Sequence, residues 1–354
     1  MEIINGKNYV SPQDDKFRIG LDIDGLQEFE LVEVPSSGKL EGRLPKRFVR
    51  LSSNYFSNYI REIQNNPNSS YETFLDNEEI RKGNIPNNFS VLLKYNHNDL
   101  AFVANETNDI VSHIKAELCA PAIMNELGVK TVYNSILVET SGYAQYVLSI
   151  DAIKPNEETF VLNDFISCDF SGWIESGMDI VGQYATFLLE RECGLTKEEI
   201  STDKYKKMID GLKDEFIVRY LANVVLLGNN DYNARNYALL VNKKTKQVRT
   251  FPCFDYEFCF NGCYLREGVR ENFELIMKYK PKILTDFAQK MKALSQIQKS
   301  GKTRLQEVLG EVLPEENESD IYYYILNKNI ETFFEVYEQV LDKEKTNPDQ
   351  LTFF

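Results

Sequence analysis

The segment 229–236, NNDYNARN, is strongly polar and follows directly on the most regular apolar stripe of the chain. Apolar residues recur there every three or four positions, which predicts a buried helix: Leu212, Phe216, Tyr220, Val224 and Leu227. Gly228 ends this helix. Two short strands are predicted next, over 237–241 and 247–251, and Asp255 follows them. A buried helix, a polar loop, a hairpin and a carboxylate in this order allow few folds for the second half of the chain.

The polar loop carries side chains suited to phosphoryl transfer. Asp231 and Asn236 are spaced as D-x-x-x-x-N, which is the spacing of the protein-kinase catalytic loop. One carboxylate must accept the hydrogen bond of the attacking hydroxyl, while an amide oxygen and a second carboxylate hold Mg²⁺ against the nucleotide phosphates. Loops rich in Asn and Asp are also common as turns and helix caps. The order of helix, loop, hairpin and Asp255 favours the kinase interpretation.

The first half supplies groups that would bind nucleotide phosphates. The apolar segment 89–95, FSVLLKY, predicts a strand that ends near Lys94. Glu117 lies on a helix that Asp109 would cap and that would end near Gly128. A strand lysine paired with a helical glutamate binds the phosphates in kinases. Taken singly, each is an ordinary exposed charged residue, but their order along the chain is that of a kinase.

Four segments resemble the HipA-like serine/threonine kinases, which include bacterial toxin kinases and smaller stand-alone members. Residues 226–240, LLGNNDYNARNYALL, resemble the family's L-[IL]-G-N-x-D-x-H-x-x-N catalytic loop, and 250–260, TFPCFDYEFCF, resemble its P-x-[FY]-D metal segment. Residues 116–138 are similar to its glutamate-bearing helix and following strand, and 89–95 fit its lysine-bearing strand. The helical remainder of the chain resembles the family only loosely.

This resemblance implies a bilobed kinase fold that transfers phosphate from ATP with Mg²⁺ to serine or threonine hydroxyls of a protein. Asp231 would be the catalytic base, Asn236 and Asp255 the metal ligands, and Lys94 and Glu117 the phosphate-binding pair. The partners implied are a protein substrate and an antitoxin-type or regulatory protein. Autophosphorylation is a further implied activity.

The chain also departs from the family pattern. Asn233 stands where the family has His, and it can donate a hydrogen bond but cannot titrate. Pro121 lies one turn after Glu117 and predicts a kink in that helix. The loop that covers the phosphates is either 36–38 or 42–46, neither of which is a G-x-G-x-x-G. Two alternatives therefore stay open: a catalytically weak or dead pseudokinase that binds a nucleotide or partner, and a small-molecule or lipid kinase.

The predicted fold class is α+β, with a β-rich N-lobe over 1–150 and a mainly helical C-lobe over 151–354. The N-lobe strands are expected over 17–23, 29–34, 89–95, 100–104, 131–138 and 144–150, with 100–104 as the hairpin partner of 89–95. The polar stretch 61–88 is interpreted as an insertion or mobile loop. The C-lobe helices are expected near 179–192, 212–227, 271–280, 283–299, 302–313 and 320–342.

Charge, targeting segments and cysteine spacing exclude several classes of protein. The chain has 40 Lys and Arg against 54 Asp and Glu, a net charge of −14, and no basic run, so direct nucleic-acid binding is not expected. Neither a signal peptide nor a membrane span is visible, which predicts a cytoplasmic protein without membrane attachment. Cys253, Cys259 and Cys263 cluster without a CxxC pair or a nearby histidine, so free thiols are favoured over a zinc site.

Two further motifs are interpreted as coincidental. The D-x-D-G at 22–25 is similar to the nucleophile motif of haloacid-dehalogenase-type phosphatases, but no βαβ alternation follows it. The Gly-Lys-Thr at 301–303 resembles the end of a P-loop, but Gln296 stands where its first glycine belongs.

Overall fold

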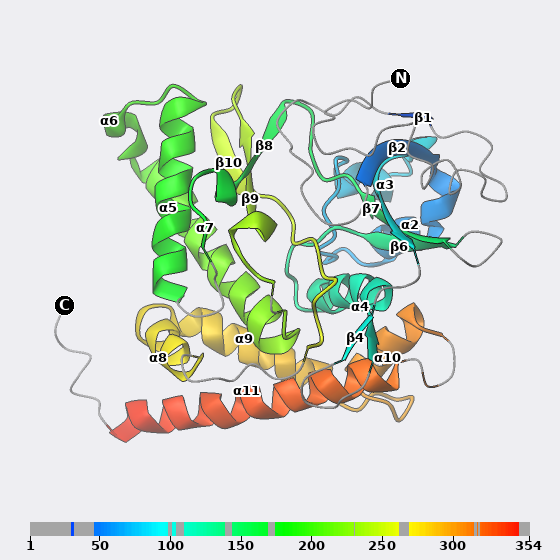
Figure 1. The fold of residues 1–354 in the computed structure, drawn as a ribbon. Helices are drawn as coiled ribbons and strands as arrows, with labels where there is room; N and C mark the ends of the chain where they lie inside the picture. Colours follow the sequence, from blue (N-terminus) through cyan, green and yellow to red (C-terminus); the bar gives the residue numbers. More distant parts are fainter. Residues whose placement is uncertain are drawn as a thin grey trace.

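The computed structural model describes residues 30–31, 46–97, 101–103, 110–138, 144–168, 174–229, 231–261, 269–314, 317 and 319–346. Their strands form a five-stranded, a three-stranded and a two-stranded sheet. Figure 1 shows the five-stranded sheet at one end of the molecule and the helices of residues 174–220 at the other. The fold is therefore α+β, with a β-rich first part and a mainly helical second part, as predicted.

The five-stranded sheet is antiparallel throughout and has the order β1-β2-β3-β7-β6. Its strands are β1 (Glu30–Leu31), β2 (Lys46–Ser52), β3 (Asn88–His97), β6 (Asn134–Val138) and β7 (Ala144–Ile150). Central β3 confirms the strand predicted over 89–95, and the β6–β7 hairpin confirms the predicted strand pair. Phe89, Val91 and Leu93 alternate along β3 and are buried on one face, so Lys94 points to the other face.

The segment 61–88 packs against the sheet and is not a mobile loop, while its interpretation as an insertion stays a prediction. It contains most of α2 (Ser57–Asn65) and all of α3 (Asn77–Arg81). Ile63, Tyr71 and Ile80 are buried and form one hydrophobic cluster with Phe89 and its neighbours. The mobile-loop alternative was wrong because a few well-spaced apolar side chains suffice to bury short helices whose other positions are polar.

The strand β4 (Ala101–Val103) pairs with β5 (Ile110–Ser112) and not with β3, which corrects the predicted hairpin of 89–95 with 100–104. The following helix, α4 (His113–Glu126), therefore begins later than predicted. Ser112, not Asp109, caps it, because the Ser112 hydroxyl accepts a hydrogen bond from the Lys115 N–H at 3.2 Å. Residues 104–109 lie outside the described residues.

The second part is built on a three-stranded antiparallel sheet with the order β10-β9-β8. Its strands are β8 (Glu157–Val161), β9 (Ala238–Asn242) and β10 (Gln247–Thr250), so the predicted hairpin after the polar loop is present. Strand β8 was not predicted. The chain passes from one sheet to the other between Ile150 and Glu157, while the division into domains at residue 150 stays a prediction.

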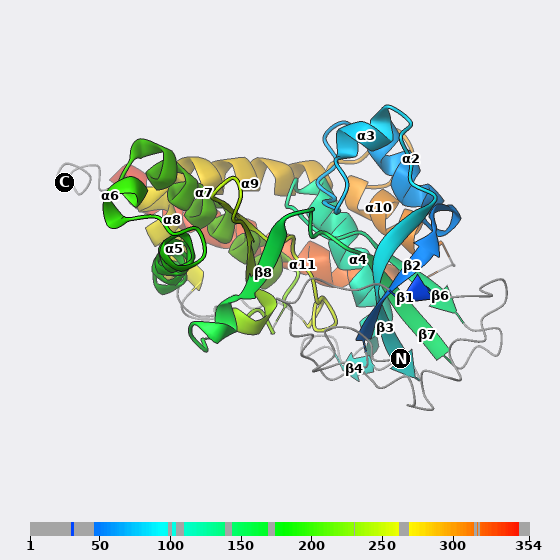
Figure 2. The ribbon, with the colours of Figure 1, turned by 90° about the horizontal axis from the view of Figure 1, so that it is seen from above.

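The helices of the second part confirm the predicted ones with shifted ends, and one short helix, Lys197–Ile200, was not predicted. They are α5 (Ile174–Arg191), α6 (Lys197–Ile200), α7 (Asp203–Tyr220), α8 (Val269–Tyr279), α9 (Pro281–Leu294), α10 (Arg304–Val312) and α11 (Asp320–Thr346). Short 3₁₀ turns occur over Ser53–Phe56, Leu162–Asp164 and Ala234–Asn236. Figures 1 and 2 show α11 running along one side of the molecule beside α8, α9 and α10. None of the helices in the described ranges combines the length and apolarity needed to span a membrane.

Candidate functional site

The polar loop is positioned by an irregular end of the helix before it. Helix α7 continues into a π-helix, Leu221–Leu226, whose residues are all buried. Gly228 then takes φ = 59°, which allows the chain to leave the helix. The Asn229 N–H donates to the Asn223 carbonyl at 2.8 Å, and the Asn329 side chain of α11 donates to the Leu226 carbonyl at 2.7 Å. π-Helical turns inside α-helices are frequent at functional sites.

Within the loop, Asp231 is held by three neighbouring asparagines. Asn233 Nδ2 donates to Asp231 Oδ1 at 2.8 Å, and Asn236 Nδ2 donates to the Asp231 carbonyl at 2.8 Å and to Oδ2 at 3.1 Å. The Asp231 N–H in turn donates to Asn229 Oδ1 at 3.0 Å. Tyr232 is buried, whereas Asp231 and Asn236 are half-buried. The carboxylate is therefore fixed in one orientation while it stays partly accessible.

Asn233, at the position where the HipA-like catalytic loop has histidine, thus orients the carboxylate through its amide. Burial raises the pKa of Asp231, the negative charge of nearby Asp255 adds to the rise, and the hydrogen bond from Asn236 opposes it. A carboxylate with a raised pKa is a better proton acceptor than an exposed one. Asn230 lies outside the described residues.

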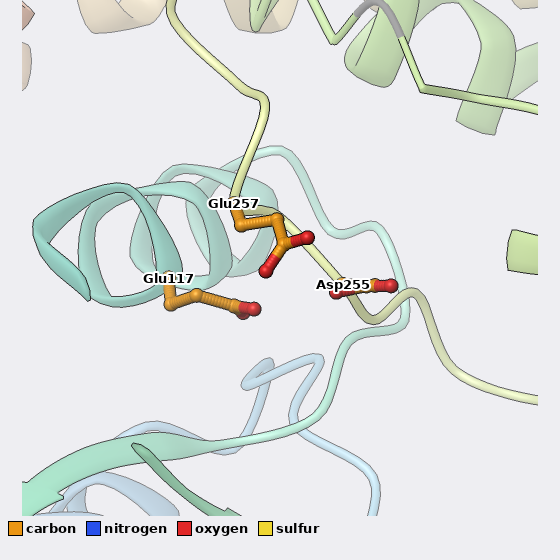
Figure 3. Close-up of side chains that lie close together, drawn as sticks. All are labelled: Glu117, Asp255 and Glu257. Atoms are coloured by element: carbon orange, nitrogen blue, oxygen red, sulfur yellow. The ribbon is translucent and has the colours of Figure 1, made fainter. Parts of the chain in front are cut away.

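Lys94 and Glu117 meet in a buried cluster of charges. Lys94 Nζ lies 2.6 Å from Glu117 Oε1, 2.6 Å from Asp255 Oδ1 and 3.1 Å from Glu257 Oε2. Figure 3 shows the three carboxylates turned toward one another, Glu117 from α4 and the other two from the segment after β10. Burial alone would lower the pKa of Lys94, but the carboxylates of Asp255, Glu117 and Glu257 outweigh it and hold the pKa well above the usual range. Lys94 therefore stays charged inside the protein.

Glu117 is also fixed from the side of the sheet. Asn134 Nδ2, on β6, donates to the Glu117 carbonyl at 2.8 Å and to Glu117 Oε2 at 3.2 Å, and Ser149 Oγ donates to Asn134 Oδ1 at 2.6 Å. Pro121 lies inside α4 without interrupting it. Burial raises the pKa of Glu117, and the charge of Lys94 opposes this rise.

Main-chain contacts bring Asp255 to this cluster. The Cys253 N–H donates to the Lys130 carbonyl at 2.9 Å, and the Val132 N–H donates to the Cys253 carbonyl at 3.2 Å, so the segment before Asp255 lies beside the end of α4. The Phe260 N–H donates to the Leu227 carbonyl at 2.6 Å, which ties the segment after it to the start of the polar loop. Asp255 has φ = 62°, an uncommon conformation that clusters at functional sites.

Glu257 is the charged residue of the site that the sequence analysis missed. Tyr256 is fully buried, and its hydroxyl forms a 2.6 Å hydrogen bond with Thr131 Oγ1. Asp255 and Glu257, on either side of it, both reach Lys94. The signal in the sequence was the D-x-E spacing around an aromatic residue in the segment FDYEF.

Of the five residues singled out from the sequence, three meet directly: Lys94, Glu117 and Asp255. The other two, Asp231 and Asn236, bond to each other, and Asp255 is close enough for its charge to raise the pKa of Asp231. Residues 22–25 and 36–38 and Cys263 lie outside the described residues, as do residues 42–45, while Lys46 begins β2. Cys253 and Cys259 are buried free thiols.

The site has the ligand atoms that a magnesium ion requires. One carboxylate oxygen from each of Glu117, Asp255 and Glu257 lies within 4.8 Å of the others. Mg²⁺ prefers oxygen ligands and is commonly bound by one or two carboxylates together with substrate phosphates. The Asn236 nitrogen donates to Asp231, so its amide oxygen is the atom suited to a metal. The donor set therefore fits Mg²⁺.

No protein-family model and no curated protein matches the sequence. Among solved structures, the chain is similar to the proinflammatory kinase CtkA of Helicobacter pylori, with 12% identity and a TM-score of 0.43 over 89% of this chain and 96% of that one. It is also similar to the structure of the toxin–antitoxin system HipA, HipB and its operator DNA from Shewanella oneidensis MR-1. The identity there is 11% and the TM-score 0.44, over 94% of this chain and 82% of that one.

Proposed function

We propose that the chain is a kinase that transfers the γ-phosphoryl group of ATP, with Mg²⁺, to a serine or threonine hydroxyl of a protein. The observation that carries this proposal is the juxtaposition of two groups of residues. A buried lysine paired with a helical glutamate contacts Asp255, and the charge of Asp255 acts on the half-buried carboxylate of Asp231. Phosphoryl transfer needs these groups close together because its catalysis consists of positioning and charge stabilisation.

Each residue then has a distinct task. Lys94 binds phosphate oxygens, and its ion pair with Glu117 keeps the ammonium charged and in place. Asp231 accepts the hydrogen bond of the acceptor hydroxyl and takes its proton as that oxygen attacks the phosphorus. Asn233 and Asn236 donate to the two oxygens of the Asp231 carboxylate and fix its orientation.

Asn236 and Asp255 are the proposed ligands of Mg²⁺. When bound, the ion neutralises charge on the phosphates during transfer. In this structure Asp255 forms a 2.6 Å ion pair with Lys94. Lys94 is also paired with Glu117, so the three side chains lie together. Nucleotide phosphates would separate them by giving Lys94 an anionic partner of its own.

The test replaces Asp231 by Asn. The variant should bind ATP and Mg²⁺ as the wild type does, while phosphate incorporation falls by about 10²–10⁴-fold because the proton acceptor is lost. Stability should change little, since Asn can still accept from Asn233 and the Asn236 amide keeps its 2.8 Å bond to the main-chain carbonyl. Incorporation is measured with labelled ATP, first on the protein alone to detect autophosphorylation and then with a general acceptor protein.

The exposed Asp164 provides the matched control, and Asp164→Asn should transfer phosphate as the wild type does. Equal transfer by the wild type and Asp231→Asn would overturn the role of Asp231. A wild-type protein that binds Mg²⁺-ATP but transfers nothing to any protein would identify a pseudokinase. Transfer to a small molecule or lipid, with none to protein, would identify the other alternative on the same site.

The proposal includes the partners that the sequence resemblance implies. A protein carries the acceptor hydroxyl, and an antitoxin-type or regulatory protein is the expected interaction partner. The net charge of −14 disfavours direct contact with nucleic acid. Purification of the intact chain with its partner, followed by the same transfer assay with and without that partner, tests whether the partner changes activity.

A further inference from the structure

Glu257 is a buried carboxylate with an incomplete set of contacts. It is 8% exposed, and its Oε2 lies 3.1 Å from Lys94 Nζ. That contact is an ion pair without the geometry of a hydrogen bond, and Oε2 accepts no hydrogen bond from any residue that the structure describes. Lys94 donates its 2.6 Å hydrogen bonds to Glu117 and Asp255 instead. A buried carboxylate oxygen without a hydrogen bond is costly unless a cation compensates it.

The neighbouring Glu117 is satisfied in a way that Glu257 is not. Its Oε1 accepts from Lys94 at 2.6 Å, and its Oε2 accepts from Asn134 at 3.2 Å. Both carboxylate oxygens of Glu117 therefore have donors on the protein. Among the described residues, Glu257 has only the longer contact with Lys94, so its Oε2 is available to a ligand.

The geometry also suits a shared ion. Oxygens of Asp255 and Glu257 lie within 4.8 Å of each other, and opposite ligands of Mg²⁺ are about 4 Å apart because each bond is about 2.0–2.1 Å. The two residues flank the buried Tyr256 and both face Lys94. Small side-chain rotations would bring both carboxylates to one cation.

We propose that Glu257 is a ligand of the divalent cation, beside Asp255, and that the Lys94 ammonium takes the place of this cation when no nucleotide is bound. This inference rests on the proposed function, because nucleotide phosphates must draw Lys94 away from Glu257. The ammonium then stays with Glu117 and the phosphates, and the divalent cation replaces it at Asp255 and Glu257. Metal and nucleotide therefore bind cooperatively.

The experiment measures metal affinity without turnover. Mn²⁺ is titrated into the full chain, followed by its electron paramagnetic resonance signal, with and without a saturating non-hydrolysable ATP analogue. Glu257→Gln, which keeps the size of the side chain, should weaken Mn²⁺ binding about tenfold or more, and Glu257→Asp should weaken it less. Glu338→Gln, an exposed position on α11, is the matched control and should bind Mn²⁺ as the wild type does.

The outcomes separate this inference from the proposed function. Mn²⁺ affinity in Glu257→Gln within twofold of the wild type would overturn it, as would a wild type that binds no Mn²⁺. If Glu257 served only to hold Lys94, its removal would strengthen metal-free nucleotide binding and leave Mn²⁺ affinity unchanged, which also overturns it. The wild type could transfer no phosphate while Glu257→Gln still binds Mn²⁺ more weakly than the wild type does. That result would support this inference and contradict the proposed function. Thermal unfolding of each variant shows that it is folded.

Discussion

Asn134 donates two hydrogen bonds to Glu117, one to its main-chain carbonyl at 2.8 Å and one to its carboxylate Oε2 at 3.2 Å. Pro121 explains the first of these bonds. It has no N–H, so the carbonyl of Glu117, four residues earlier in α4, lacks its ordinary helical donor. Asn134 supplies that donor and at the same time orients the carboxylate that pairs with Lys94. The main-chain bond that Pro121 removes is thus replaced by a side-chain contact that also positions the site.

This relationship predicts that positions 134 and 121 are coupled. Asn134→Ala should lower the free energy of unfolding by about 1–3 kcal/mol, because a buried carbonyl loses its donor. In a Pro121→Ala background, the restored main-chain N–H can bond to the Glu117 carbonyl, so the same substitution should cost less. Urea denaturation of the wild type, both single variants and the double variant measures the coupling. Additive effects would contradict the donor role of Asn134.

Lys94 should matter for stability as well as for nucleotide binding. Lys94→Met removes the ammonium shared by three carboxylates, and breaking a buried ion pair in this way costs about 3–5 kcal/mol. The loss should shrink when Glu117→Gln is added, because one of the carboxylates is then neutral. Lys82, exposed directly after α3, is the control, and Lys82→Met should leave both stability and ATP affinity unchanged. Equal effects of the two lysine substitutions in denaturation and ATP titration would contradict the placement of Lys94.

The elements around Asp231 could be predicted because each is encoded locally. The apolar stripe of α7, Gly228 and the β9–β10 hairpin lie in sequence order within one short region. Hydrophobic periodicity predicts such elements because it depends only on the local sequence and not on contacts with distant segments. The π-helical turn at its end was not predictable, since Asn329, a residue from α11, bonds its last carbonyl.

Other features depended on contacts between distant segments. The pairing of β4 with β5 was missed because strand partners are chosen by the fold, and a short loop after a strand only suggests a hairpin. The buried side chains of 61–88 pack against apolar side chains of the five-stranded sheet, which come from distant parts of the sequence. Glu257 was missed because the D-x-E spacing in FDYEF does not by itself reveal that Lys94 lies opposite it.

Asn329 should act on the polar loop from a distance. It is fully buried on α11, and its Nδ2 donates to the Leu226 carbonyl at 2.7 Å, just before the loop that bears Asp231. Asn329→Leu should lower the free energy of unfolding by about 1–3 kcal/mol and reduce phosphate transfer more than ATP affinity. Asn327→Ala, at a partly exposed position on the same helix, is the control. Wild-type transfer by Asn329→Leu would show that this contact does not position Asp231.

The last prediction concerns Asp151, directly after β7. Burial raises its pKa to about 6. Hydrogen bonds from the Ile153 N–H at 2.9 Å and from Ser90 Oγ at 3.3 Å oppose this rise. The folded state therefore binds this proton more tightly than the unfolded state, so the contribution of Asp151 to stability falls as the pH rises from about 4 to about 6. Asp151→Asn cannot titrate, and its amide oxygen can still accept from Ile153. The free energy of unfolding of the variant minus that of the wild type should therefore increase across this range and level off above it. Urea denaturation at several pH values measures this difference, and Asp210→Asn on the exposed face of α7 is the control. A difference that does not change with pH would contradict the raised pKa.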